Sequence, residues 1–234
     1  MSGKLYLFPV PLSEGPLDEV LPPYNKACLI PIRHFIVEDV RTARRFLKKN
    51  DPNFDIDACS FQVLNKHTTP TEVTTFLAPL LAGHDIGLMS EAGCPAVADP
   101  GADVVALAQA KGFTVVPLVG PSSLLLALMG SGFNGQRFAF EGYLPVEKEA
   151  RTKTLKRLEQ RGIAEDMTHL VIETPYRNNL LLADMIATLS PKTRICVALD
   201  LTGMDASIKT LTVAQWRKQA VELPKKPCLF LFYT

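Results

Sequence analysis

Two acids and an arginine stand close together at Glu38, Asp39 and Arg41, directly after the apolar segment Phe35–Val37. A carboxylate in such a position can orient a hydroxyl group or take its proton. An arginine can grip a phosphate or a carboxylate through two parallel hydrogen bonds. The same acids can instead cap the next helix and favour the positive end of its dipole. The residues alone leave both interpretations open.

A second candidate region is the stretch SEAGCPAVADPG, from Ser90 to Gly101. Its glycines and prolines exclude a regular helix or a central strand. It follows an apolar strand-like segment, as do the small-residue loops VPLSEG, GPSS and ETPYR elsewhere in the chain. Ligands of open α/β sheets bind beyond the carboxyl ends of the strands. Each loop by itself can be an ordinary turn, but together they predict one site where backbone approaches a ligand.

The loops lack the glycine fingerprints of phosphate cradles. The chain has no GxxxxGK[ST] motif, and no GxGxxG follows its first strand-like segment, which argues against a nucleoside triphosphate or a dinucleotide. Serines and small residues suit a less charged ligand that contains adenosine. His67, in a loop, can act as a base near neutral pH or be a plain surface residue. The cysteine and histidine spacings predict no metal site.

Strand-like and helix-like segments alternate almost to the end of the chain, which predicts mostly parallel α/β sheets. The expected strands are Leu5–Val10, Phe35–Val37, 61–64, 84–90, 113–119, Phe138–Tyr143, His169–Glu173, 193–201, 207–213 and 227–233, the last of them spaced closely enough for antiparallel pairs. The expected helices are Asp39–Lys49, 70–83, Gly101–Lys111 capped by Asp99, one after residue 120, Glu147–Arg161, 174–189 and a short one around Trp216. The first α/β unit is complete near Val119, so we expect domains at 1–118 and 119–234.

Basic residues form two stripes at helical spacing. One consists of Arg41, Arg44, Arg45 and Lys48, and the other of Lys153, Lys156, Arg157 and Gln160, with Arg151 and Arg161 nearby. The net charge is only +1, so any affinity for nucleic acid needs such local patches. The stripes therefore indicate either an RNA footprint or ordinary solvated helix faces.

Six segments in order, LYLFPVPL, VEDVR, LMSEAGCPAVADPG, VVPLVGPSS, FEGYLP and VIETPYR, resemble the motif series of the tetrapyrrole methylase superfamily. The branch of small-subunit ribosomal RNA 2′-O-ribose cytidine methyltransferases is the most similar. The resemblance covers nearly the whole chain. It implies two α/β domains with the cofactor, S-adenosyl-L-methionine, in the cleft between them, and a homodimer that methylates ribosomal RNA.

The resemblance also implies roles for individual residues. Glu38, Asp39 and Arg41 become catalytic candidates. The implied cofactor-binding residues are Pro9, Pro11, Leu12, Glu91, Gly93, Cys94, Gly120, Ser122 and Ser123, and, from the second half, Glu173, Thr174, Pro175, Ala198 and Leu201.

Several positions depart from the pattern of the ribosomal branch. Glu91 replaces the usual aspartate, Val40 replaces a threonine, and the segment Leu12–Glu14 replaces an IGN turn. Leu199–Gly203 replaces an RELTK segment, so that its arginine and lysine are absent. These departures leave two alternatives open: a methyltransferase for a small tetrapyrrole-like acid, and a non-catalytic protein that binds an S-adenosyl ligand.

Composition favours a cytoplasmic protein that does not cross a membrane. The five cysteines are scattered and odd in number, which favours a reducing compartment over a disulfide framework. The apolar run at the N-terminus is too short for a signal-peptide core, and the run LLLALMG is far below the length of a membrane span.

Overall fold

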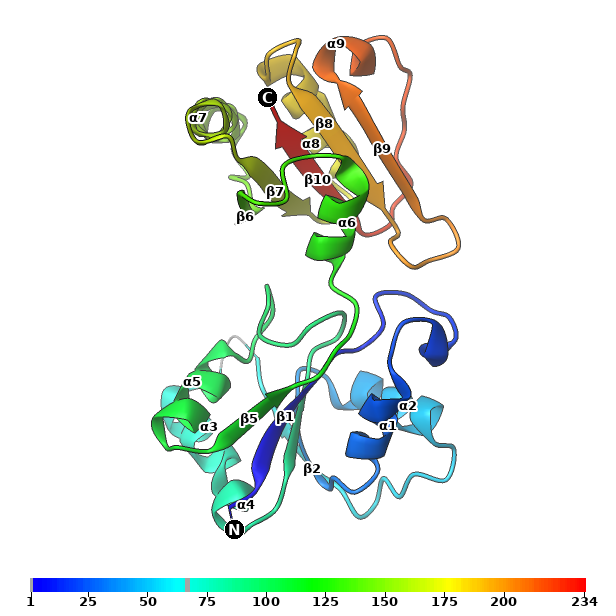
Figure 1. Cartoon of the computed structure of the whole chain (residues 1–234), viewed down its shortest axis with the longest axis vertical. Coiled ribbons are helices and arrows are strands. Elements are labelled where there is room, and N and C mark those ends of the chain that lie inside the picture. The colour runs from blue at the N-terminus through cyan, green and yellow to red at the C-terminus, as the bar shows by residue number, and fades with distance from the viewer. Residues whose placement is uncertain (1, 66–67) are drawn as a thin grey trace. The chain divides into compact units, whose positions relative to one another are not determined.

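The computed structural model describes residues 2–65 and 68–234. They form two compact units, one ending at Ser122 and the other beginning at Ser123, and each is built around its own sheet (Figure 1). The domain boundary expected between residues 118 and 119 stays a prediction. No helix among the described residues is both long and apolar enough to cross a membrane.

Unit 1 is a parallel sheet with helices on both faces. Its strands are β1 (Lys4–Phe8), β2 (His34–Val37), β3 (Ser60–Val63), β4 (Ile86–Met89) and β5 (Thr114–Pro117), in the order β3-β2-β4-β1-β5. Its helices are the 3-10 turn η1 (Leu17–Glu19), α1 (Pro23–Leu29), α2 (Val40–Asn50), α3 (Pro70–Phe76), α4 (Ala78–Leu81) and α5 (Ala102–Ala110).

Alternating strand residues give unit 1 two apolar layers. Leu5, Ile36 and Leu88 pack with residues of α3, α4 and α5, whereas Phe8 and Phe35 pack with residues of α1 and α2. Figure 1 shows these two groups of helices on opposite faces of the sheet. This arrangement is what a parallel sheet requires, because both of its faces must be covered.

Local signals set several helix starts in unit 1. The capping box that the sequence predicts is present: the Thr69 side chain accepts a hydrogen bond from Glu72 N–H, and the Glu72 carboxylate accepts one from Thr69 N–H. The helix expected over 70–83 is divided into α3 and α4 at Leu77. The expected cap by Asp99 is wrong, because α5 starts after Gly101 and no side chain caps it.

Unit 2 is a mixed sheet, which confirms the antiparallel pairs expected near the C-terminus. Its strands are β6 (Phe138–Tyr143), β7 (Thr168–Glu173), β8 (Arg194–Leu199), β9 (Ser207–Thr212) and β10 (Cys228–Tyr233), in the order β6-β7-β10-β8-β9, with only β6 and β7 parallel. Its helices are α6 (Ser123–Ser131), α7 (Lys148–Glu165), α8 (Asn178–Thr188) and α9 (Val213–Trp216).

The central strand β10 shows how the core of unit 2 is divided. Leu229 and Leu231 face the layer that contains α6. Phe230 and Phe232 face the layer that contains α7, α8 and Trp216. The apolar run CLFLFY is buried on both faces, which explains why it lacks the polar alternation of a surface strand.

Candidate functional site

The carboxyl ends of the strands of unit 1 meet at one edge of its sheet. Phe8, Val37 and Met89 are in register at the ends of β1, β2 and β4, and Leu7 of β1 pairs with Pro117 at the end of β5. The loops that begin at Pro9, Glu38, Ser90 and Leu118 therefore all leave the sheet from this edge. Parallel pairing thus gathers the predicted loops of this unit, as open α/β sheets do at their ligand sites.

Two of these loops are joined through backbone hydrogen bonds. Val10 N–H donates to the Gly93 carbonyl over 2.9 Å, and Gly93 N–H donates to the Val10 carbonyl over 3.0 Å. Gly93 has φ +76°, and an added Cβ would stand 3.2 Å from Leu12 Cδ2. The bridge needs a residue without a side chain at this position.

The loop after β5 packs against the same region. A Cβ on Gly120 would stand 2.2 Å from Pro9 Cβ, so only glycine permits this approach. The Cys94 thiol lies 3.5 Å from the Pro121 carbonyl oxygen, to which it donates, and burial raises the pKa of this thiol. A raised pKa disfavours the thiolate, so Cys94 is suited to packing rather than to nucleophilic attack.

The Ser90–Gly101 segment holds four residues in left-handed conformations: Gly93, Ala96 (φ +66°), Ala98 (φ +63°) and Gly101 (φ +132°). Alanine pays a steric penalty there that glycine does not. Four such residues bend the chain repeatedly, which explains why the segment is neither helix nor strand.

Three acids gather at this edge. One carboxylate oxygen of Glu38 accepts a hydrogen bond from Glu91 N–H over 3.2 Å, and Glu91 Oε1 accepts one from the Thr42 hydroxyl over 3.4 Å. Burial raises the pKa of Glu38, and the nearby charge of Asp99 raises it further. Burial also raises the pKa of Asp99, against a lowering hydrogen bond from the side chain of Ser90. Carboxylates with raised pKa values in a cleft are candidates for proton transfer.

Asp39 and Arg41 occupy different surroundings from Glu38. Asp39 is the N-cap of α2, where its Oδ1 accepts a hydrogen bond from Thr42 N–H over 2.8 Å. That bond holds the pKa of Asp39 below its ordinary value. Arg41 is exposed in the first turn of α2. Asp39 thus has the structural role that the sequence left open, and its catalytic role stays a prediction.

Asp99 and Ser90 are the residues of this edge that sequence reasoning missed. Asp99 was interpreted as a helix cap because it precedes a proline. The signal that could have identified it was its place in the same loop as Glu91. His67 lies outside the described residues. Among the described residues, no group of three or more His, Cys, Asp or Glu side chains is arranged to hold a metal ion.

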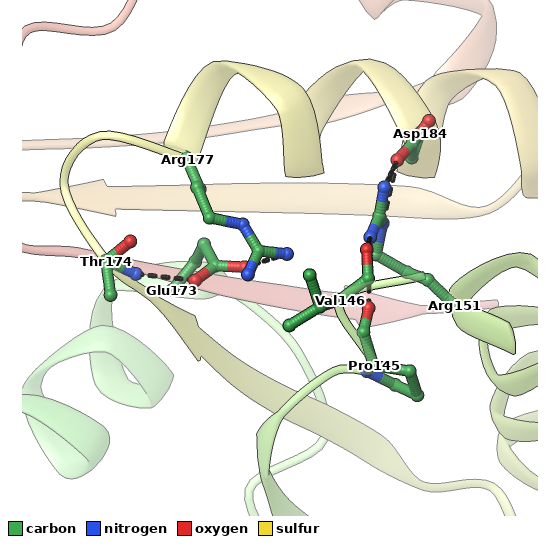
Figure 2. Close-up of polar contacts among 7 residues, drawn as sticks. All are labelled: Pro145, Val146, Arg151, Glu173, Thr174, Arg177 and Asp184. Atoms are coloured by element: carbon green, nitrogen blue, oxygen red, sulfur yellow. Dashed lines mark hydrogen bonds and ion pairs between the residues drawn. The ribbon is translucent and has the colours of Figure 1, made fainter. Parts of the chain in front are cut away.

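In unit 2, the conformation of the loop after β7 is held by Glu173, the last residue of that strand. One oxygen of the buried Glu173 accepts a hydrogen bond from Thr174 N–H over 2.8 Å, and the other lies 3.1 Å from Arg177 Nη2 (Figure 2). Pro175 follows within the turn that precedes α8. Glu173 therefore shapes the loop, and it leaves the exposed Thr174 available to a ligand.

The end of β8 has a different construction. Ala198 is buried in the layer that faces α6, and Leu201 packs against that layer. Between them, Asp200 Oδ2 lies 2.7 Å from Lys226 Nζ, which also reaches Asp205 over 2.6 Å. A lysine that is distant in sequence thus lies beside the segment whose arginine and lysine are missing, but two aspartates compensate its charge. The Ala198 side chain belongs to the core, so only its backbone can face a ligand.

Arg151 does not belong to a basic surface, contrary to the RNA footprint suggested for its helix. It is 2% exposed and forms an ion pair with Asp184 of α8. It also donates hydrogen bonds to the Pro145 and Val146 carbonyls (Figure 2). Arg161 is partly neutralised by Glu141 and Glu165. The exposed basic residues of α7 are Lys148, Lys153, Lys156 and Arg157.

Known proteins resemble the chain in sequence and in fold. It is 30% identical over 214 residues to a Pseudomonas aeruginosa protein named ribosomal RNA small subunit methyltransferase I, an alignment that covers 92% of this chain and 72% of the relative. The Escherichia coli O157:H7 protein of the same name is 32% identical over 200 residues, which covers 86% of this chain and 66% of the relative. No protein-family model matches the chain.

The crystal structure of the methyltransferase CobJ superposes with a TM-score of 0.63 at 14% identity, covering 100% of this chain and 95% of that one. This likeness confirms the predicted α/β fold class. The sequence relatives confirm the resemblance to the tetrapyrrole methylases and their ribosomal RNA branch. The chain therefore belongs to the family of ribosomal RNA small subunit methyltransferase I.

Proposed function

We propose that this chain transfers a methyl group from S-adenosyl-L-methionine to a ribose 2′-hydroxyl of small-subunit ribosomal RNA. The observation that carries the proposal is the match to ribosomal RNA small subunit methyltransferases I over 92% of the chain. The edge of unit 1 supports it, because small-residue loops and half-buried acids converge there.

S-adenosyl-L-methionine, when bound, supplies a methyl group on a positively charged sulfur. Gly93 and Gly120 let the loops after β1, β4 and β5 pack closely at this edge of unit 1, because a side chain at either position would crowd Leu12 or Pro9. The left-handed Ala96 and Ala98 lie in the same group of loops. Irregular loops of small residues suit recognition of such a ligand by main-chain hydrogen bonds and apolar contact. We assign the holding of the cofactor here to Pro9, Pro11, Leu12, Glu91, Gly93, Cys94, Gly120, Ser122 and Ser123. The contribution of Glu173, Thr174, Pro175, Ala198 and Leu201 stays a prediction of the resemblance.

Glu38 is the residue that we propose as proton acceptor. The transferred group needs a nucleophilic oxygen, so the proton of the acceptor hydroxyl must leave. Burial raises the pKa of Glu38, which makes its ionised form a better base. The hydrogen bond from Glu91 N–H fixes the direction of its carboxylate. Exposed Arg41, three residues further on, is placed to bind an RNA phosphate.

The test is methyl transfer from labelled S-adenosyl-L-methionine to small ribosomal subunits that lack the modification. We expect label in the RNA that resists alkaline hydrolysis at the next phosphodiester, because a 2′-O-methyl group removes the internal nucleophile. Label at an alkali-sensitive position would place the methyl group on a base. Transfer to a tetrapyrrole-like acid instead of RNA, or cofactor binding without any transfer, would favour the two alternatives.

We further propose that the protein acts as a homodimer in the cytoplasm. The resemblance supports the dimer, and five free cysteines support a reducing compartment. Light scattering of the purified chain tests the dimer, and a monomer at micromolar concentration would contradict it.

A further inference from the structure

A groove in unit 1 separates α2 from the loop that follows β1. It has two adjoining compartments of about 510 and about 430 Å³, which share Leu17 and Lys49. Each compartment has a volume in the range of about 300–1,000 Å³ that is usual for small-ligand sites. The groove is thus long enough for two ligand groups joined near Lys49.

The first compartment adjoins the acids of the candidate site. Its lining includes Thr42, Ser90 and Glu91, and Glu91 N–H donates to Glu38. Its apolar lining includes Phe46 and Met89. A group bound there is next to the proposed proton acceptor and has an aromatic side chain within reach.

Two cations of α2 line the groove without carboxylate partners. Lys49 Nζ donates to the Gly15 carbonyl over 2.5 Å, a neutral acceptor that leaves the charge of the ammonium uncompensated. Arg45 has no hydrogen bond or ion pair with any residue in the described part of the chain. The acids that line the compartments are Glu14, Asp18 and Glu91, the last of which accepts from Thr42.

On the basis of the proposed function, we propose that this groove binds two successive nucleotides of single-stranded RNA. The acceptor nucleotide occupies the first compartment, its neighbour occupies the second, and the phosphate between them lies on Arg45 and Lys49. Unstacked bases on aromatic or apolar surface and phosphates on Lys or Arg are the usual means of single-strand recognition. The groove thereby selects an unpaired RNA segment.

The same helix offers a matched control. Arg44 and Lys48 are exposed neighbours of Arg45 and Lys49 that line neither compartment. Arg44 lies over the Phe61 ring, 5.4 Å from its centroid, and Lys48 donates to the Pro52 carbonyl over 3.0 Å. Replacing either pair with alanine changes the net charge equally. A difference in RNA binding between the two double variants therefore reports the position of the charges rather than their number.

The experiment measures binding of a short fluorescent single-stranded oligoribonucleotide by anisotropy, with S-adenosylhomocysteine present, across a salt series. We expect R45A/K49A to bind roughly tenfold or more weakly. We also expect the slope of log affinity against log salt to fall by about 0.7, because one phosphate contact is lost. R44A/K48A should stay close to wild type in both respects.

Methyl transfer by the wild type, measured in parallel, separates the two proposals. RNA binding that depends on Arg45 and Lys49 but without methyl transfer supports the groove and overturns the proposed function. Methyl transfer by the wild type, together with equal RNA binding by R45A/K49A and R44A/K48A, overturns the proposed groove alone. A wild type that neither binds nor methylates RNA overturns both.

Discussion

The ion pair between Arg151 and Asp184 gives a prediction for the stability of unit 2. Both side chains are buried, at 2% and 8% exposure. Replacing Asp184 with leucine leaves a buried guanidinium whose remaining acceptors are the Pro145 and Val146 carbonyls. Breaking a buried pair from one side costs about 3–5 kcal/mol. We therefore expect D184L to lower the free energy of unfolding of unit 2 by about that amount.

The double variant R151M/D184L removes both charges, so neither is left buried without its partner. Replacing such a pair with apolar residues of similar volume is neutral or stabilising by about 1–4 kcal/mol. We expect the double variant to be at least as stable as the wild type, although each single variant is destabilised. The effects of the two substitutions are then far from additive, as expected for residues that interact rather than for independent sites.

The single tryptophan of the chain provides the assay. Trp216 is 2% exposed in unit 2, where its Nε1–H donates to the Ile195 carbonyl. Its fluorescence during urea unfolding therefore reports on that unit. Single variants within about 1 kcal/mol of wild type, or a double variant as unstable as the singles, would refute the reasoning.

Three further predictions concern the edge of unit 1. A96G should stabilise unit 1 by up to about 1 kcal/mol in urea unfolding followed by circular dichroism. Glycine relieves a left-handed strain of about 1–2 kcal/mol, which exceeds the cost of about 0.4–1 kcal/mol from the added entropy of the unfolded chain. A loss of stability would contradict this prediction. E38Q should lower kcat by about 10²–10⁴-fold. In the wild type, activity should fall as the pH drops through the raised pKa of Glu38, because protonation disables the base. A pH profile that E38Q leaves unchanged would count against Glu38 as the proton acceptor. G120A should lower the free energy of unfolding by about 1–3 kcal/mol, because its Cβ would clash with Pro9. G15A is the control: its Cβ would meet nothing within 4 Å, so its free energy of unfolding should stay within about 0.5 kcal/mol of the wild type. Equal effects of the two substitutions would argue against the clash.

Sequence patterns predicted the features that depend on local interactions. The capping box of Thr69 and Glu72 is decided within one helical turn, and it is present. The strand Phe138–Tyr143 also has the predicted bounds. Parallel pairing then follows from the alternation of strands and helices, so the loops at Pro9, Glu38 and Ser90 could be expected at one edge.

Features that depend on distant residues could not be predicted in this way. Arg151 has the helical spacing of a surface residue, and only the approach of Asp184 from α8 makes it a buried ion pair. Lys49 was outside the predicted stripe, yet it lines the groove while Lys48 does not. The position of the loop after β1 relative to α2 decides this difference. Helix α1 was not predicted at all, because two prolines precede a short segment without clear periodicity.

The most direct test of the central claim is calorimetric titration of S-adenosylhomocysteine into the wild type, G93V and G112V. Both glycines have similar positive φ angles, +76° and +73°, but only Gly93 lies in the proposed cofactor loop, and a Cβ on Gly112 would meet nothing within 4 Å. We predict binding near micromolar strength, about −8 kcal/mol, for the wild type and G112V, and its loss in G93V, with all three proteins folded by circular dichroism. Undiminished binding by G93V, or no binding by a folded wild type, would contradict the assignment of the cofactor to this edge of the sheet.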